Sequence, residues 1–148
     1  GAGALGGKLA VANAKLAYAE YQRLFSGPAW EELARKGARP QRPLWASTST
    51  KNPSYKDTIY VDELIGPDTV NTMPEETIRA FRDHGTVART IDAGVAEARK
   101  VFADVAAAGV SYDDVVTVLE AEGVQKFADA FAGLLKGIES KQSVVSAP

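Results

Sequence analysis

Residues 42–74 read RPLWASTSTKNPSYKDTIYVDELIGPDTVNTMP, and this stretch decides the fold class. Two short segments, 42–48 and 68–73, are typical of strands; the first has apolar Leu44, Trp45 and Ala46 at its centre, too few residues for an alternating pattern. A strand of that kind suits a parallel sheet that is buried on both faces. A polar loop, 47–56, and the helix-like segment YVDELI lie between the two strands. The order strand, loop, helix, strand predicts a βαβ unit.

The polar loop follows the C-terminal end of the first strand, which is where α/β barrels carry their ligand site. It is rich in side chains that donate hydrogen bonds, namely Ser47, Thr48, Ser49, Thr50, Asn52, Lys51 and Lys56. Hydroxyl groups donate hydrogen bonds to a phosphate, and a lysine ammonium adds positive charge. The same residue types are common in ordinary turns, so the loop composition alone leaves a plain turn and a phosphate site both open.

The remainder of the chain is predicted to be mostly helical. Apolar residues at helical spacing, with Gly and Pro at the boundaries, predict helices over 5–25, 74–84, 92–108 and 112–139, and WEELARKG adds one more short helix. Pro74 begins the second of the long helices, with Glu75 and Glu76 in its first turn, where negative charge favours the helix N-terminus.

The ends of the last two helices carry their own signals. Asp92 is the expected N-cap of the helix over 92–108, and Ser111 with Asp114 resembles a capping box for the next helix. Gly123 is expected to interrupt that last helix, and residues 140–148 are expected to form a frayed tail.

Long strings of this sequence resemble the actinobacterial-type transaldolases. WASTSTKNPSYKDTIYVDELIGPDTVNTMPEETI is similar to the last two barrel strands of that family, and GVSYDDVVTVLEAEGVQKFADAFAGLLKGI is similar to its C-terminal helices. KLAVANAKLAYAEYQRLF resembles the preceding helix. The resemblance implies an α/β fold: the C-terminal portion of a TIM (β/α)8 barrel, with two short parallel strands, a mostly helical remainder, and all of residues 1–148 in one barrel domain.

The resemblance also implies a reaction. Transaldolases of the pentose phosphate pathway reversibly transfer a dihydroxyacetone unit between sugar phosphates through a lysine Schiff base, without a metal or organic cofactor. In the family that lysine lies on an earlier strand, and no lysine here matches its motif, so we expect no catalytic residue in this chain. The matching phosphate-binding positions are Ser49 and Lys51, and Ser47 could share the role. Lys51 stands where the family usually has arginine, which keeps the charge but loses bidentate geometry.

Several other residues have simpler interpretations. Asn52 is expected to shape the turn, and His84 to sit at a helix end where its charge suits the helix dipole. Asp62 and Glu63 are adjacent on a short helix and therefore do not face each other as an acid and base pair. Trp45 is expected in the core or in the wall of a sugar site.

Composition excludes several classes of protein. With 148 residues, 45% hydrophobic and 24% charged, the chain is typical of a globular domain, and its net charge of −2 gives no basic field for nucleic acid or an anionic membrane surface. The absence of cysteine and the single histidine argue against disulfides and a zinc site. No apolar run approaches the roughly 20 residues of a membrane span, and the apolar stretch at the start is too short for a signal peptide, so we expect a cytoplasmic protein.

The predicted strands cannot close a barrel by themselves. A complete barrel takes roughly 250 residues, and two strands alone leave unpaired edges. We therefore expect the N-terminal part of the same enzyme as a second chain, or self-association, unless the chain is a recombinant piece. Two alternatives stay open: a non-catalytic helical module that binds a sugar phosphate or a protein, and an aldolase-type enzyme that uses Lys51.

Overall fold

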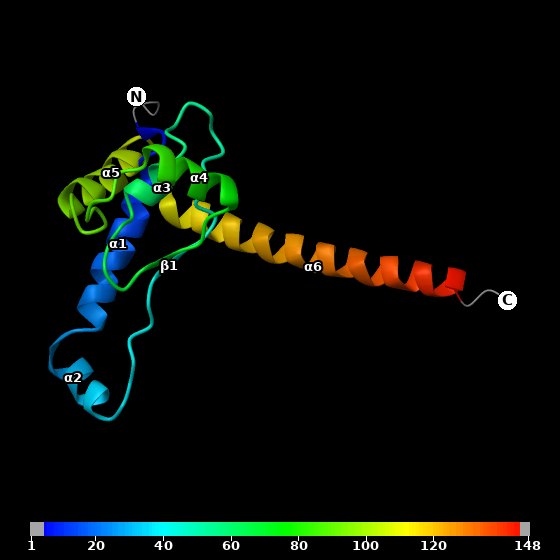
Figure 1. Cartoon of the computed structure of the whole chain (residues 1–148), viewed down its shortest axis with the longest axis horizontal. Helices are drawn as coiled ribbons and strands as arrows, with labels where there is room; N and C mark the ends of the chain where they lie inside the picture. Colours follow the sequence, from blue (N-terminus) through cyan, green and yellow to red (C-terminus); the bar gives the residue numbers. More distant parts are fainter. Residues whose placement is uncertain (1–4, 146–148) are drawn as a thin grey trace. The chain divides into compact units, whose positions relative to one another are not determined.

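A computed structural model describes residues 5–145 of the chain, which divides into two compact units, residues 1–108 and 109–148. The first unit contains α1 (Leu9–Leu24), α2 (Gly27–Arg35), β1 (Leu44–Trp45), α3 (Ile59–Asp62), β2 (Val70–Asn71), α4 (Glu75–His84) and α5 (Val95–Ala107), and the second contains α6 (Tyr112–Val145) (Figure 1). The assignment of both units to one barrel domain stays a prediction.

The βαβ unit is present as predicted. β1 and β2 pair in parallel, with Leu44 opposite Val70 and Trp45 opposite Asn71, and α3 lies in the connection between them. The ladder is two residues long in each strand, shorter than the expected 42–48 and 68–73. Within residues 5–145 each strand pairs with one other strand, so its second edge forms no backbone hydrogen bonds that would extend the strand. A parallel pair with a helical crossover confirms the α/β class.

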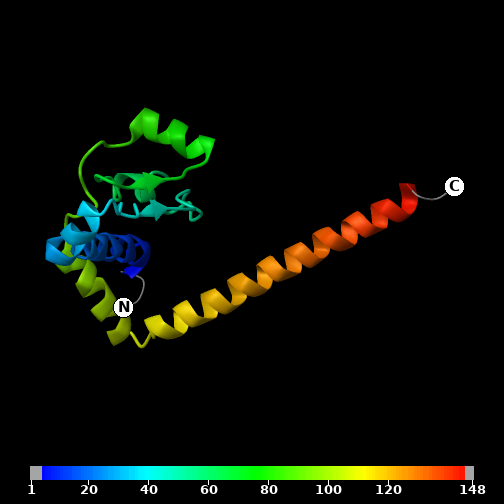
Figure 2. The same ribbon diagram turned by 90° about the horizontal axis from the view of Figure 1, so that it is seen from below.

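The strand pair lies in a layer between α1 and α4 (Figure 2). On the α1 side the core is formed by Tyr18, Leu64 and Ile91, each at most 6% exposed, and Trp45 packs against it. Burying side chains of this size contributes roughly 1.5–3 kcal/mol each. The Tyr18 hydroxyl donates to the Pro67 carbonyl oxygen at 3.1 Å, which ties α1 to the turn before β2.

The start of α5 corrects one prediction. Asp92 is not its N-cap, because the helix begins at Val95 after Gly94, whose φ of 69° is left-handed. Asp92 instead accepts hydrogen bonds from the Arg89 guanidinium, with Nε at 2.9 Å from Oδ2. The ion pair occupies the carboxylate within a turn that precedes the helix, so the helix starts three residues later than predicted.

The second unit is one long helix. Gly123 does not interrupt α6, because a glycine in a helix costs only about 1 kcal/mol relative to alanine, and pairs such as Lys126 with Glu122 span the position. The frayed-tail prediction is wrong for residues 140–145, which contain no Gly or Pro and continue the helix; residues 146–148 lie outside the described part.

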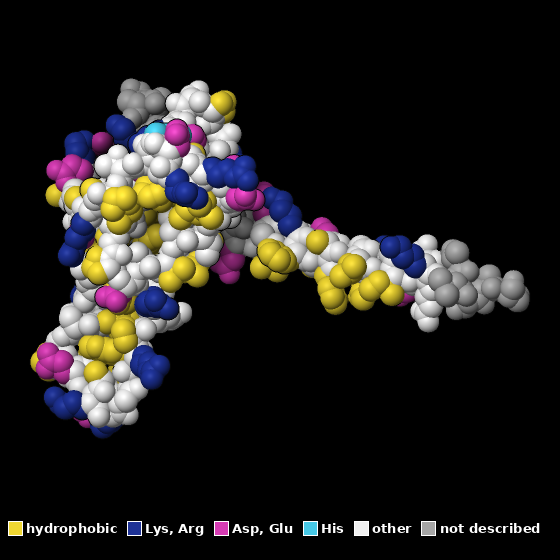
Figure 3. Space-filling view, in the orientation of Figure 1, with side chains coloured by type: hydrophobic (Ala, Val, Ile, Leu, Met, Phe, Trp, Pro, Cys, Tyr) yellow, Lys and Arg dark blue, Asp and Glu magenta, His cyan; other side chains and the backbone are white. Residues whose placement is uncertain are grey.

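The start of α6 follows the prediction. The Asp114 backbone N–H donates to the Ser111 hydroxyl oxygen at 3.2 Å, which satisfies one of the free donors of the first turn. Figure 3 shows apolar side chains along this helix, among which Phe127 is 83% exposed.

Candidate functional site

The site begins where the chain leaves β1. Ser47 has a φ of 54°, in the left-handed region that non-glycine residues seldom occupy. The next residue, Thr48, is only 3% exposed, whereas Ser47 and Lys51 are exposed. The sharp turn at Ser47 therefore places one hydroxyl inside the protein and leaves its neighbours on the surface.

The three predicted phosphate-binding residues share one hollow of about 460 Å³. Ser47, Ser49 and Lys51 line it from the loop, and Ala10 and Ala14 line it from α1. The Lys51 ammonium donates to the Ser49 hydroxyl oxygen at 2.5 Å, so a positive charge and a hydroxyl stand together. This arrangement can offer an anion one charged donor and one neutral donor, and its use for phosphate stays a prediction.

The buried hydroxyl of Thr48 belongs to a network that the sequence analysis missed. Its oxygen lies 2.7 Å from Asn71 Oδ1 and 2.8 Å from the Thr72 carbonyl oxygen, and it donates its single proton to one of these two acceptors. Asn71 Nδ2 donates to the Tyr60 carbonyl oxygen at 3.0 Å. The loop is thus joined through β2 to α3. No pattern within STST marks Thr48, since serine and threonine simply alternate there and the partner Asn71 lies 23 positions away.

The far end of the loop is a turn of its own. Asn52 Oδ1 accepts a hydrogen bond from the Ser54 N–H at 2.9 Å, which confirms the prediction that Asn52 shapes the turn. The Thr50 hydroxyl lies 3.1 Å from the carbonyl oxygens of both Lys56 and Asp57. Ser49 and Lys51 therefore stand between two anchored segments.

Asp62 at the end of α3 is a centre of polar contacts. Its carboxylate accepts from Lys56 Nζ at 2.6 Å, from the Thr58 hydroxyl at 2.6 Å and from the Thr86 N–H at 2.8 Å. Partial burial raises the pKa of this carboxyl, but the hydrogen bonds from Lys56, Thr58 and Thr86 outweigh that effect and hold it below its ordinary value. The group is held as a carboxylate, which suits a structural ion pair.

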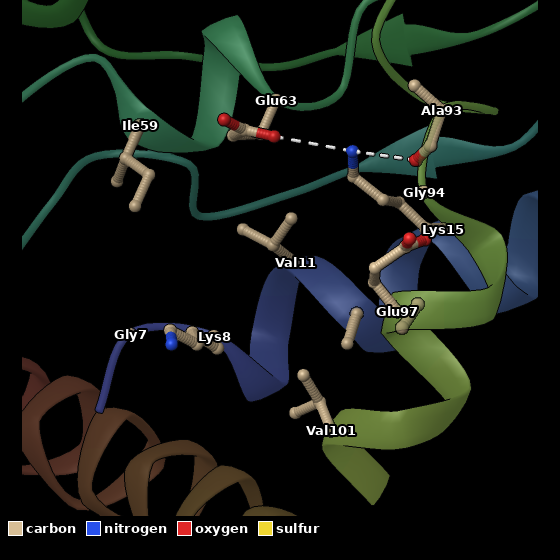
Figure 4. A pocket seen from close by; sticks show the side chains of 12 residues that line it. Gly7, Lys8, Val11, Lys15, Ile59, Glu63, Ala93, Gly94, Glu97 and Val101 are labelled. Atoms are coloured by element: carbon tan, nitrogen blue, oxygen red, sulfur yellow. Dashed lines mark hydrogen bonds and ion pairs between the residues drawn. The ribbon is translucent and has the colours of Figure 1, made fainter. Parts of the chain in front are cut away.

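Lys15 is a buried lysine on α1 that the sequence analysis did not single out. Its ammonium donates to the Thr90 carbonyl oxygen at 2.9 Å. It also donates to the Ala93 carbonyl oxygen at 3.1 Å and lies 3.3 Å from Glu63 Oε2, as Figure 4 shows. These contacts join α1 to the turn before α5 and to the end of α3. Glu63 therefore has a different partner from Asp62, which confirms that the two do not form an acid and base pair.

The hollow beside Lys15 measures about 290 Å³, and its lining includes apolar residues of α1 and α5, such as Val11 and Val101, together with charged Lys8 and Glu97. The Lys15 ammonium donates two hydrogen bonds to carbonyl oxygens and pairs with the Glu63 carboxylate, contacts that hold separate elements together.

His84 makes specific contacts in addition to its place at the end of α4. Nε2 lies 2.8 Å from Asp57 Oδ1 and Nδ1 lies 3.0 Å from Asp83 Oδ2. The hydrogen bonds to Asp57 and then Asp83 raise the pKa of this imidazole above its ordinary value. His84, at the end of α4 as expected, thus also connects this helix to Asp57 in the segment before α3.

Trp45 lies in the core, as one of its two expected places, and its part in a sugar site stays a prediction. The indole packs against the core around Tyr18 and also lines the hollow beside Ser49. Its Nε1 is buried and has no hydrogen-bond partner within residues 5–145. Over the same residues there is no group of three acidic or histidine side chains placed to hold a metal ion, and no helix long and apolar enough to cross a membrane.

Comparison with known proteins agrees with this architecture. The sequence profile of the Transaldolase/Fructose-6-phosphate aldolase family matches residues 2–138. The chain belongs to this family. It is 60% identical over 133 residues to a transaldolase of Frankia alni, covering 89% of this chain and 36% of the relative. It is 54% identical over 136 residues to transaldolase 1 of Streptomyces avermitilis, covering 91% and 36% respectively.

A more distant relative, transaldolase 2 of a Nostoc species, is 48% identical over 142 residues, covering 95% of this chain and 37% of the relative. The chain thus spans a little over a third of the length of the curated relatives it matches. The family prediction is confirmed, and with it the prediction of part of an α/β barrel: the parallel pair, its crossover helix and the flanking helices fit a segment of the transaldolase fold.

Proposed function

We propose that this chain supplies part of a transaldolase of the pentose phosphate pathway. The whole enzyme transfers a dihydroxyacetone unit reversibly between sugar phosphates through a lysine Schiff base. The observation that carries this proposal is family membership over residues 2–138, together with a hollow at a barrel-strand end where Ser47, Ser49 and Lys51 meet. The relatives are named transaldolases, which supports the same reaction here.

Within that enzyme the loop after β1 binds the phosphate of the sugar. The Lys51 ammonium supplies charge, the Ser49 hydroxyl supplies a neutral donor beside it, and Ser47 lies on the same hollow. Lysine in place of the family's usual arginine gives one point contact rather than a planar pair. The site needs neither a metal nor an organic cofactor.

The Schiff-base lysine comes from the part of the barrel that this chain does not include. The buried lysine of this chain, Lys15, has its protons engaged by Thr90, Ala93 and Glu63, and Lys51 is an exposed residue of a polar loop. A lysine that attacks a carbonyl must lose its proton, which an apolar pocket or a neighbouring cation promotes by lowering its pKa. The partner is therefore the N-terminal part of the enzyme, and self-association is the alternative.

Because sugar phosphates are charged and stay where they are made, we place the enzyme in the cytoplasm.

The test is reconstitution. The intact 148-residue chain is produced together with the part of the Frankia alni transaldolase that it does not match, and transfer from fructose 6-phosphate to erythrose 4-phosphate is measured. We expect activity only when both parts are present. Borohydride should trap the substrate adduct on the Frankia part, as read by mass spectrometry. An adduct on this chain, or co-purified parts without activity, would contradict the proposal.

Lys51→Ala tests the phosphate site within the same assembly. Loss of one charge-assisted hydrogen bond of about 1.5–3 kcal/mol predicts a rise in KM for fructose 6-phosphate of roughly 10-fold to 100-fold. Lys36→Ala is the matched control, because Lys36 is an exposed lysine paired with Glu32 on α2, and it should leave KM unchanged.

A further inference from the structure

Thr48 and Asn71 connect the phosphate loop to β2 and α3 through hydrogen bonds. We propose that Thr48 and Asn71 are positioning residues that fix Ser49 and Lys51 for a phosphate group. The inference rests on the proposed function of the loop and adds the means by which a loop on two short strands keeps its geometry.

The first step is the turn at Ser47. A φ of 54° is energetically unfavourable for a serine, so contacts of neighbouring residues must maintain this conformation. Thr48 supplies those contacts, because it is 3% exposed and its hydroxyl lies 2.7 Å from Asn71 Oδ1 and 2.8 Å from the Thr72 carbonyl oxygen. If the hydroxyl is removed, nothing polar holds Thr48 inward and the turn can relax.

The second step is the other side of the network. Asn71 stands in β2 opposite Trp45, and its Nδ2 donates to the Tyr60 carbonyl oxygen at 3.0 Å. The oxygen of the Asn71 side chain therefore lies within hydrogen-bond distance of the Thr48 hydroxyl, and its nitrogen donates a hydrogen bond to α3. A single amide thus links the phosphate loop, the second strand and the crossover helix.

The third step is the position of the two phosphate donors in this frame. Ser49 follows Thr48 directly, and Lys51 lies one residue beyond Thr50, whose hydroxyl reaches the carbonyl oxygens of Lys56 and Asp57. The segment 49–51 is short, follows the anchored Thr48 and is held at its middle residue, Thr50, so its donors are organised before a ligand arrives. Preorganisation of this kind strengthens binding by lowering the ordering cost.

The experiment uses this 148-residue chain in its assembly with the complementary part of the Frankia alni transaldolase, with inorganic phosphate as the probe and nuclear magnetic resonance of the Ser49 and Lys51 amides as the readout. Thr48→Val keeps the shape of the side chain and removes its hydroxyl, whereas Thr48→Ser keeps the hydroxyl. Thr72→Val is the matched control, because it removes a hydroxyl from the residue that follows β2, one that is exposed and donates to the Trp45 carbonyl oxygen at 3.1 Å.

We expect Thr48→Val to weaken phosphate binding roughly 10-fold and to increase the fast motion of amides 49–51, in line with the loss of one hydrogen bond to the loop. Thr48→Ser should bind within roughly 2-fold of the original chain, and Thr72→Val should change neither readout. Combining Thr48→Val with Asn71→Ala should cost less than the sum of the two, because both act on one contact.

The outcomes separate the two proposals. Phosphate binding that Lys51→Ala abolishes but Thr48→Val leaves intact overturns the positioning role and leaves the phosphate loop standing. An original chain whose Ser49 and Lys51 amides do not respond to phosphate overturns the phosphate loop, and the positioning role with it. A Thr48→Val variant that loses its folded spectrum while Thr48→Ser also fails to recover binding shows a general packing role instead and likewise overturns the inference.

Discussion

Replacing Lys15 with methionine is expected to destabilise the first unit strongly. The side chain is buried on α1, and its ammonium is the common donor to the carbonyl oxygens of Thr90 and Ala93, with Glu63 Oε2 at 3.3 Å. Methionine has a similar length and fills the same space, so the change removes chiefly the ammonium group. The Ala93 carbonyl oxygen then loses the Lys15 donor, and the Thr90 carbonyl oxygen keeps only the backbone N–H of Ala93, at 3.1 Å.

The size of the effect follows from these contacts. A hydrogen bond to a charged group contributes about 1.5–3 kcal/mol, so two such bonds contribute about 3–6 kcal/mol. Methionine also removes the cost of burying a charge, which offsets part of this loss. The net loss in the free energy of unfolding is then about 2–3 kcal/mol. With a urea dependence of about 1.5 kcal/mol per M, the unfolding midpoint falls by roughly 1.5–2 M.

Tryptophan fluorescence during urea unfolding measures this effect, because Trp30 and Trp45 both lie in the first unit. Lys100→Met is the matched control: Lys100 pairs with Asp104 on the surface of α5, with 72% of its side chain exposed, and its loss should cost less than about 0.5 kcal/mol. If Lys15→Met unfolds within about 0.5 kcal/mol of this control, the ammonium does not hold the three elements together and the reasoning is refuted.

Three further changes test other contacts of the first unit. Contacts with Asp57 and Asp83 raise the pKa of His84, so the stability they give is fully present below the unfolded pKa, near 6.5, and is lost as pH rises through the folded pKa. The urea midpoint should therefore change less between pH 6 and pH 8 in His84→Gln than in the original chain. Ile91→Ala, at a residue that is 0% exposed, should lower the free energy of unfolding by about 2–5 kcal/mol, and a loss under about 1 kcal/mol would show that the core around it is not well packed. Gly66→Ala should lower the thermal unfolding midpoint, since the new Cβ would lie 2.1 Å from Ile91 Cγ2, and combining it with Ile91→Ala should recover part of the loss.

Much of the secondary structure was accessible from the sequence because its signals are local. The parallel pair followed from two short strands separated by a polar loop and a helix, and α4 followed from Pro74 with Glu75 and Glu76 behind it. The N-terminal contact of α6 followed from Ser111 and Asp114. The errors arose where a local signal had a competitor: Arg89 occupied the carboxylate of Asp92, and the surrounding turns of α6 carried the helix through Gly123.

The candidate site divides in the same way. Ser47, Ser49 and Lys51 were named from their residue types and from a resemblance to transaldolases, and they share one hollow. The residues that support them were not named, because Thr48 meets Asn71 across 23 positions of sequence. A pattern within the loop cannot show which strand will lie beside it.

The sequence by itself determined the family, the βαβ order, the helices and the donors of the loop, since each depends on residue type and on spacing over a few turns of chain. The tertiary structure decided which donors are free and which are engaged. Lys15 is buried against carbonyl groups 75 and 78 residues away, and Thr48 is turned inward by a left-handed serine, while Lys51 stays exposed. The physical reason is that a lysine or a hydroxyl has no fixed role of its own: burial and the nearest acceptor assign one, and both depend on which distant segments the fold brings together.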